Sequence, residues 1–107
     1  MITEADRIIV ERFKQLALER GISMLDVIVF GSRARGDADQ GSDLDILVIV
    51  ERSNREIREI IRLCAWEIGF DEGLFVQTVV MTKEEKENSP QRSSLLMLAV
   101  DREGIRM

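Results

Sequence analysis

Two short runs of β-branched, apolar residues frame a polar, glycine-rich segment, and this arrangement constrains the fold more than any other feature. The runs are Met24–Phe30 and Leu44–Val50, and the segment between them reads GSRARGDADQGSD. Runs this short and this apolar are typical of strands that are buried on both faces, whereas the segment has no apolar period and indicates turns and loop. Because such strands need cover on both sides, the sequence predicts an α/β domain.

Helical patterns flank these two strands. A first helix is expected over residues 3–20, where apolar side chains recur at helical spacing, and a glycine follows as a stop. A second helix is expected to begin at Ser53, which has the capping-box spacing to Glu56. This helix is expected to run to about Ile68, with Gly69 beyond its end.

The remainder of the chain continues the alternation of strand and helix. A third strand is expected at Leu74–Met81, and Thr82 with Glu85 repeats the capping-box spacing for a short polar helix. The Ser-Pro pair at positions 89–90 is expected to start a last helix that runs to Gly104, because proline is tolerated at the first helical position.

The connections between the strands predict a mixed sheet. The connection between the first two strands is short enough to favour an antiparallel pair. The connection to the third strand contains a full helix and favours a parallel pair with a right-handed crossover. With 107 residues, the chain has room for one domain, so we expect a small mixed sheet flanked by helices over residues 1–107.

The composition excludes several kinds of function. The chain contains no histidine, which excludes Ser-His-Asp and Cys-His nucleophile systems and the usual zinc sites, so a bound metal is expected to have oxygen ligands. A net charge of −5 argues against general binding of nucleic acid, which depends on neutralising phosphates. The GxxxxGK[ST] pattern of a P-loop is missing as well.

The start of the chain and its single cysteine bear on location. The opening residues MITEADR contain no apolar block followed by a cleavage site, and no apolar run is long enough to span a membrane. Cys64 has no partner for a disulfide, which fits a reducing compartment. We therefore expect a cytoplasmic protein that does not enter the membrane.

A candidate phosphate-binding turn follows the first strand. Gly31 and Ser32 stand where the strand stops and a helical turn can begin, so backbone N–H groups and the helix dipole would attract a phosphate there. The Ser32 hydroxyl can add a hydrogen bond, and either Arg33 or Arg35 can direct a positive charge toward a polyphosphate.

A pair of carboxylates opens the second strand. Asp43 and Asp45 are two positions apart, so both side chains point to the same face, with Cα atoms about 6.6 Å apart. Two neighbouring negative charges repel unless water screens them or a cation lies between them. Mg²⁺ suits this arrangement, because it takes one or two carboxylates together with waters and substrate phosphates. Two such ions, about 3.5–4 Å apart, would clamp an in-line displacement at phosphorus.

The glycine-serine turn, ten further residues and the sequence Asp43-Leu44-Asp45 resemble the signature of the minimal nucleotidyltransferase family, within the polymerase-β-like superfamily. The resemblance implies that fold, with Gly31, Ser32 and Arg35 on the nucleotide and the two aspartates as catalytic residues on Mg²⁺. It also implies transfer of a nucleoside monophosphate, usually AMP from ATP, to a hydroxyl. Many relatives are antitoxins of HEPN-domain toxins, so a HEPN-domain partner and a homodimer or hetero-oligomer are expected.

The sequence departs from the family at one position. Active relatives usually carry a third carboxylate on the strand after the crossover helix, where it can act as the base. Gln77 is the polar residue nearest that position here, and Asp71 and Glu72 precede the strand. Two functions therefore stay open: a nucleotidyltransferase, or a catalytically weak nucleotide-binding module that neutralises a HEPN-type partner by contact.

The second helix also carries a second apolar stripe, formed by Leu63, Trp66 and Phe70, on the side away from its core stripe. Either the first or the last helix covers this stripe, or it is a partner surface. The apolar run Leu95–Val100 in the last helix raises the same question.

Overall fold

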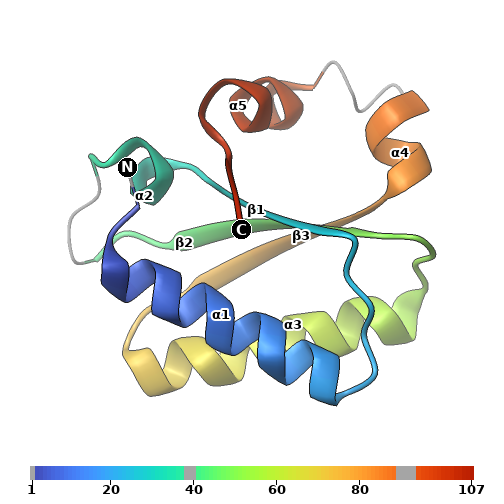
Figure 1. Cartoon of the computed structure of the whole chain (residues 1–107), viewed down its shortest axis with the longest axis horizontal. Coiled ribbons are helices and arrows are strands. Elements are labelled where there is room, and N and C mark those ends of the chain that lie inside the picture. Colours follow the sequence, from blue (N-terminus) through green and yellow to red (C-terminus); the bar gives the residue numbers. More distant parts are fainter. Residues whose placement is uncertain (1, 38–40, 89–93) are drawn as a thin grey trace.

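The computed structural model describes residues 2–37, 41–88 and 94–107, which form a four-stranded sheet with helices on both faces (Figure 1). In chain order the elements are α1 (Glu4–Glu19), β1 (Asp26–Phe30), α2 (Ser32–Arg35), β2 (Leu44–Val50), α3 (Arg55–Glu72), β3 (Val76–Thr82), α4 (Lys83–Asn88), α5 (Leu95–Glu103) and β4 (Ile105–Arg106). Helices α1 and α3 cover one face, and α4 and α5 lie on the other. The expected mixed sheet flanked by helices is confirmed.

The strand order is β3-β2-β1-β4. Strands β1 and β2 are antiparallel, with Phe30 opposite Asp45, and β2 and β3 are parallel, with Asp45 beside Gln77. Both expected pairings are therefore confirmed. This register decides the site, because it brings residues from three strands into one row across the sheet.

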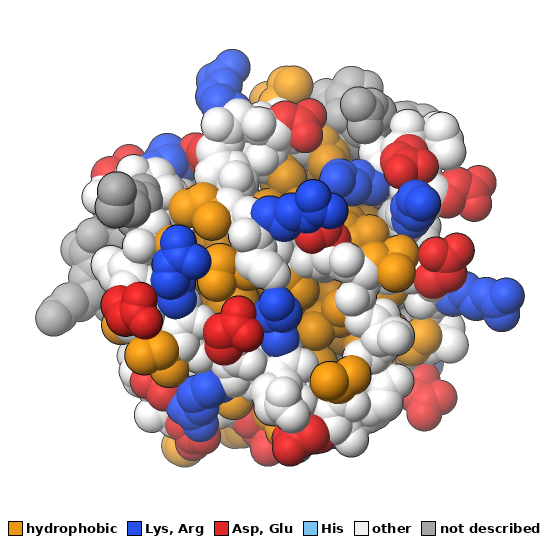
Figure 2. Space-filling view, viewed as in Figure 1, with side chains coloured by type: hydrophobic (Ala, Val, Ile, Leu, Met, Phe, Trp, Pro, Cys, Tyr) orange, Lys and Arg blue, Asp and Glu red, His pale blue; other side chains and the backbone are white. Residues whose placement is uncertain are grey.

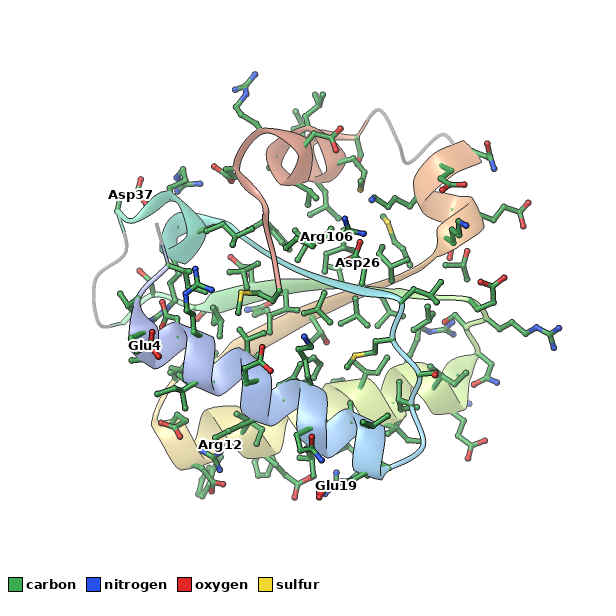
Figure 3. All side chains as sticks on the ribbon, in the orientation of Figure 1. Glu4, Arg12, Glu19, Asp26, Asp37 and Arg106 are labelled. Carbon is green, nitrogen blue, oxygen red and sulfur yellow. The ribbon has the colours of Figure 1, made fainter. Side chains whose placement is uncertain are left out.

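The sequence pattern does not predict β4, which pairs antiparallel with β1 at the opposite edge from β3. A strand of two residues is too short to show a period, so its pairing depends on contacts made elsewhere in the chain. One such contact is the hydrogen bond of 2.8 Å that Nε of Arg106 donates to Oδ1 of Asp26; both residues are labelled in Figure 3. Strands β1 and β3 also begin later than expected, at Asp26 rather than Met24 and at Val76 rather than Leu74.

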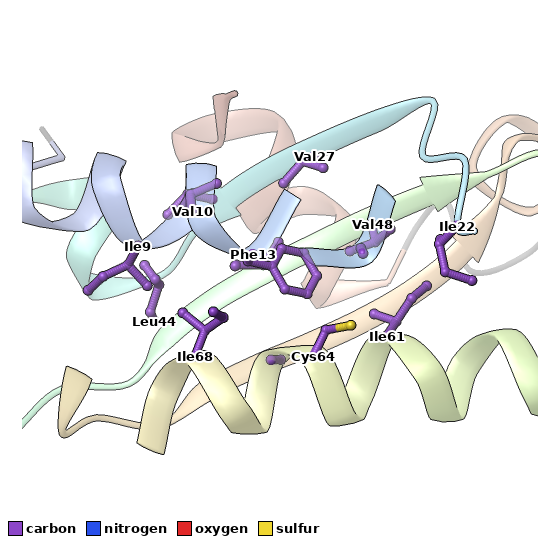
Figure 4. Close-up of a cluster of buried hydrophobic side chains, with 14 of the residues drawn as sticks. Ile9, Val10, Phe13, Ile22, Val27, Leu44, Val48, Ile61, Cys64 and Ile68 are labelled. Carbon is purple, nitrogen blue, oxygen red and sulfur yellow. The ribbon is translucent and has the colours of Figure 1, made fainter. Parts of the chain in front are cut away.

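The larger core lies between the sheet and helices α1 and α3 (Figure 4). Phe13 of α1 and Ile61 and Cys64 of α3 are fully buried against Val48 of the central strand β2. Burying each large apolar side chain contributes about 1.5–3 kcal/mol. A smaller core on the other face packs α5 against β1, β2 and β3. The sheet is thus held rigidly from both sides.

The predicted bounds of α3 were wrong at both ends. The N-cap is Asn54 rather than Ser53, because the Asn54 side chain accepts a hydrogen bond of 2.8 Å from the Ile57 amide. The helix continues through Gly69 and ends before Gly73, which adopts a φ of 75° in the left-handed region. Two glycines were thus available as stops, and packing decided between them.

The predicted capping box of α4 is confirmed, since the Glu85 amide donates to Thr82 Oγ1 and the Thr82 amide donates to Glu85 Oε1. The predicted start of the last helix at positions 89–90 lies outside the described residues. Helix α5 itself is capped by the side chain of Ser94, which accepts from the Met97 amide, and it ends at Gly104 as expected.

The described helices leave the second apolar stripe of α3 uncovered. Exposed fractions are 55% for Trp66 and 73% for Phe70, and Leu63 is exposed too. Leu95 and Leu98 of α5 are likewise exposed, whereas Met97 and Val100 are buried. The face in Figure 2 shows basic and acidic side chains interspersed. None of the helices in the described ranges has the length and apolar character needed to cross a membrane.

Candidate nucleotide site

The candidate site lies where β1 ends and β2 begins, on the face of the sheet that α5 covers. Phe30, Asp45 and Gln77 lie side by side in the β1–β2–β3 register, so their side chains share that face. Asp43 stands two residues before Asp45 and points the same way, as the sequence predicted. The Gln77 amide confirms this placement by donating a hydrogen bond of 2.9 Å from Nε2 to Asp43 Oδ2.

Gly31 lies directly against Asp45. A Cβ atom built on Gly31 would lie 2.4 Å from Oδ2 of Asp45, so no larger residue fits without a shift of the carboxylate. The backbone of Gly31 also has φ 81° and ψ −161°, a conformation that essentially only glycine adopts. The two reasons for glycine at this position are independent, and the first shows that the turn lies in contact with the Asp45 carboxylate.

Helix α2 is a single turn that starts at Ser32, with Gly31 as its N-cap. Within the part of the chain that the structure describes, neither the amide nor the hydroxyl of Ser32 has a hydrogen-bond partner. Ser32 is half-buried and directly follows Gly31, and both groups can donate to an anion. The geometry therefore suits a phosphate oxygen at Ser32.

The structure separates the two arginines that the sequence offered. Arg35 is exposed and donates hydrogen bonds to both carboxylate oxygens of Glu103, at 3.1 and 3.2 Å, and to Asp37 at 3.1 Å. Its positive charge also lies near enough to Asp45 to oppose the rise in the pKa of Asp45. Arg33 turns away and pairs with Asp6 at 2.8 Å. Arg35 is thus the exposed arginine whose charge reaches Asp45, and it stays the candidate for contact with a polyphosphate.

Nothing in the sequence singled out Asp6, which the structure brings close to the site. It is one of the acidic residues in the first turn of α1, where acids are common. Its side chain is instead buried, with 3% exposure, and receives the guanidinium of Arg33. The pattern of α1 carries no signal for this contact, because the partner is 27 residues away.

The electrostatics of the two carboxylates favour a cation. Burial raises the pKa of Asp45, and the charge of Asp43 raises it further. Two carboxylates and the Gln77 amide offer oxygen ligands, which Mg²⁺ prefers. In residues 2–37, 41–88 and 94–107, no three acidic, histidine or cysteine side chains gather into a closed metal cage. The donor set thus fits an open Mg²⁺ site that substrate phosphates complete.

The parallel register places Gln77 of β3 beside Asp45, and Gln77 is the residue that the sequence offered nearest to an expected third carboxylate. The two acids that precede the strand lie at the end of α3, where Arg12 of α1 pairs with Asp71 at 3.4 Å and with Glu72. Helix α3 packs on the face of the sheet opposite to the one that Asp45 and Gln77 share. The site in the described residues therefore contains two carboxylates and an amide.

A glycine turn against two carboxylates on a mixed sheet defines the polymerase-β-like nucleotidyltransferase fold. A solved structure described as a toxin–antitoxin with AMP-PNP has this fold, with a TM-score of 0.57 at 17% sequence identity, over 90% of this chain and 69% of that one. The family model described as "Nucleotidyltransferase domain" matches residues 7–100, and the chain belongs to that family. No curated protein sequence matched the chain significantly.

Proposed function

We propose that this nucleotidyltransferase domain binds ATP together with Mg²⁺. Gly31 and Ser32 receive the triphosphate, Arg35 adds positive charge, and Asp43 and Asp45 hold Mg²⁺. The observation that carries the proposal is the contact of Gly31 with the Asp45 carboxylate. It is so close that a Cβ atom built on Gly31 would lie 2.4 Å from Asp45 Oδ2. This contact supports a single ligand that the turn and the carboxylates would bind together.

The residues present fit the metal. Mg²⁺ is commonly held by one or two carboxylates, with waters and phosphate oxygens in its other positions. When bound, it would neutralise charge on the phosphates and orient them for displacement, with a second ion doing the same on the leaving side. Asp43 and Asp45 supply the negative charge, and the Ser32 amide and hydroxyl supply donors on the opposite side of the phosphate.

The proposed reaction transfers a nucleoside monophosphate to a hydroxyl. The acceptor oxygen forms a bond to the α-phosphorus, the bond from that phosphorus to the bridging oxygen breaks, and pyrophosphate leaves. The acceptor proton must pass to a base. Gln77 is neutral and cannot take it, so in this chain the proton has to go to solvent or to a group of the partner.

Gln77 favours the second candidate function. Its amide donates to Asp43 and partly compensates that charge, whereas a carboxylate would add a third. A site of this kind retains the groups that bind ATP and loses the group that accelerates transfer. The domain would then act as a nucleotide-binding module with weak catalysis that neutralises its partner by contact.

The proposed partner is a HEPN-domain toxin, with this chain as its antitoxin in a hetero-oligomer. The family resemblance motivates this assignment, and the similarity of fold to a component of a toxin–antitoxin structure with AMP-PNP supports it. The hydroxyl acceptor would belong to that partner. Co-purification with the product of the neighbouring coding sequence is the direct way to obtain it.

The binding proposal is tested by removing both charges. Asp43→Asn with Asp45→Asn should abolish the affinity for ATP that depends on Mg²⁺, measured by titration calorimetry. The matched control is Asp71→Asn with Glu72→Gln, which removes the same charge at the C-terminal end of α3, on the opposite face of the sheet, and should leave the affinity unchanged. Unchanged affinity in the first variant would exclude the proposed site.

The two functions are separated by incubation of the co-purified complex with ATP labelled at the α-phosphate. Label on the partner supports transfer, and a stable, unlabelled complex supports the binding module.

A further inference from the structure

A buried ion pair that contributes no proposed ligand joins α1 to the candidate site. Arg33 NH1 lies 2.8 Å from Asp6 Oδ1, with side-chain exposures of 12% and 3%. Asp6 is the one charged or polar residue in the described ranges that is buried. A pair of charges withdrawn from water in this way calls for a physical explanation.

Arg33 also reaches the loop that carries the first carboxylate. Its Nε donates a hydrogen bond of 2.9 Å to the backbone oxygen of Ser42, which directly precedes Asp43. The backbone of Arg33 belongs to the turn that starts with Gly31 and Ser32. One side chain therefore connects the phosphate-binding turn, the metal-binding loop and the start of α1.

Stability does not account for this pair. Burying two charges costs free energy that the attraction between them roughly offsets, and apolar residues of similar volume often stabilise a protein as well or better. A buried guanidinium does supply fixed geometry, because its planar fork holds Nε and NH1 in set directions. Asp6 is itself fixed, since its amide donates to Thr3 Oγ1 in the N-cap of α1.

We propose that Arg33 and Asp6 are positioning residues, which hold the Gly31–Ser32 turn and Asp43 at the separation that a metal-bound triphosphate requires. The inference rests on the proposed function, because the separation matters only if one ligand binds both parts. It implies that the pair sets how strongly Mg²⁺ and ATP assist each other's binding, with no contact between Arg33 and phosphate.

The test uses Arg33→Lys, which keeps the charge and loses the fork, and Asp6→Asn, which keeps the shape and loses the charge. ATP affinity is measured by calorimetry with Mg²⁺ and with EDTA, at a temperature at which circular dichroism shows each variant folded. The ratio of the two affinities should fall about tenfold or more, the usual effect of removing a group that orients metal ligands. The affinity in EDTA should stay within about twofold.

Arg12→Lys is the matched control. It alters another arginine, which lies on α1 and joins this helix to α3 through Asp71 and Glu72, on the face of the sheet opposite to Asp43 and Asp45. The ratio of its ATP affinity with Mg²⁺ to its ATP affinity in EDTA should equal that of the wild type. A direct phosphate contact of Arg33 would instead lower the affinity in EDTA as much as the affinity with Mg²⁺, and this result would overturn the proposal, as would an unchanged ratio.

Hydrogen exchange of the ligand-free protein keeps this inference separate from the proposed function. Amides of the segments 31–34 and 42–44 should exchange faster in Arg33→Lys and Asp6→Asn than in Arg12→Lys. If wild-type protein binds no ATP with Mg²⁺, the proposed function fails, whereas exchange still reports on the pair. Equal exchange in all three variants would refute positioning by Arg33 and Asp6.

Discussion

Asp45 shows how a single residue can combine a functional environment with a cost to the fold. Its carboxylate is half-buried, faces the like charge of Asp43 and touches the backbone of Gly31. Burial and the neighbouring charge both raise its pKa, and the more distant Arg35 only partly opposes them. These surroundings therefore disfavour the ionised form of Asp45 in the free protein, and a cation bound beside it would favour that form.

This environment predicts a pH-dependent gain in stability from Asp45→Asn. Because the native pKa is raised above its ordinary value of 3.8, the folded state binds the proton more tightly than the unfolded chain. The contribution of Asp45 to the free energy of unfolding is thus fully present below the ordinary pKa and is lost as the pH rises through the raised pKa. At neutral pH, the free energy of unfolding of the variant should exceed that of the wild type by less than about 1 kcal/mol, because water screens the charge.

Urea unfolding in EDTA between about pH 3 and about pH 7 checks this expectation. The difference between variant and wild type should vanish at the acid end. A variant that is less stable than the wild type at neutral pH would mean that the Asp45 anion makes a stabilising contact.

Gln77→Glu should add a third carboxylate to the site with almost no change in shape. The glutamate would stand next to Asp45 in the parallel register, where it can accept the proton of an attacking hydroxyl. A positioned base typically contributes 10²–10⁴-fold, so we expect transfer of labelled AMP to the partner to accelerate by about 10²-fold. Gln77→Ala, which removes the amide and adds no base, serves as the control. Equal rates in the two variants would show that proton removal does not limit transfer.

At the scale of elements, α3 shows that local signals place a helix well and its ends poorly. The sequence predicted a helix over this segment, and Ile61, Cys64 and Ile68, which recur at helical spacing, are buried. The end was misplaced because Gly69 is a plausible stop in sequence and an interior residue in the structure. A Cβ atom there would lie 2.5 Å from the Leu74 carbonyl oxygen, so the glycine permits the close return of the chain into β3.

Gly69→Ala should consequently destabilise the protein, contrary to what helix propensity predicts. In an isolated helix interior, alanine would stabilise by about 1 kcal/mol over glycine. Overlap with the backbone of Leu74 and with Val76 Cγ2 at 3.3 Å forces a shift that costs about 1–3 kcal/mol. Chemical denaturation gives the free energy directly, and an increase in stability would show that the β3 entry can move freely.

At the scale of the whole molecule, the exposed stripe on α3 borders a groove of about 500 Å³ between that helix and the start of β3. Trp66 and Phe70 stack with centroids 5.4 Å apart, and Phe75 is 71% exposed beside them. Aromatic surface of this extent is typical of interfaces, which is the hypothesis that the sequence raised for this helix.

Trp66→Ala separates an assembly surface from a merely exposed one. Since the ring is half-exposed and one stacked pair contributes about 0.5–1.5 kcal/mol, we expect a loss of stability near 1 kcal/mol. A change in molar mass by light scattering, or a loss of the co-purified partner, would assign assembly to this helix. If mass and partner binding both stay as in the wild type, the stripe has no part in assembly.

Most of the architecture could be read from the chain, because strands, helices and caps depend on neighbours a few residues apart. The runs around the polar segment, the Thr82–Glu85 capping box and the antiparallel and parallel pairings follow from such local patterns and from connection lengths. The candidate ligands Gly31, Asp43 and Asp45 also came from spacing alone, and their roles stay predictions.

Contacts between distant residues decided the rest. The choice of Arg35 over Arg33, the burial of Asp6, the passage of α3 through Gly69 and the pairing of β4 each depend on a partner that chain folding brings into contact. A side chain's partner across the fold leaves no period or cap in its own segment. The candidate residues were thus encoded locally, whereas the choice of which residues face one another was set by packing.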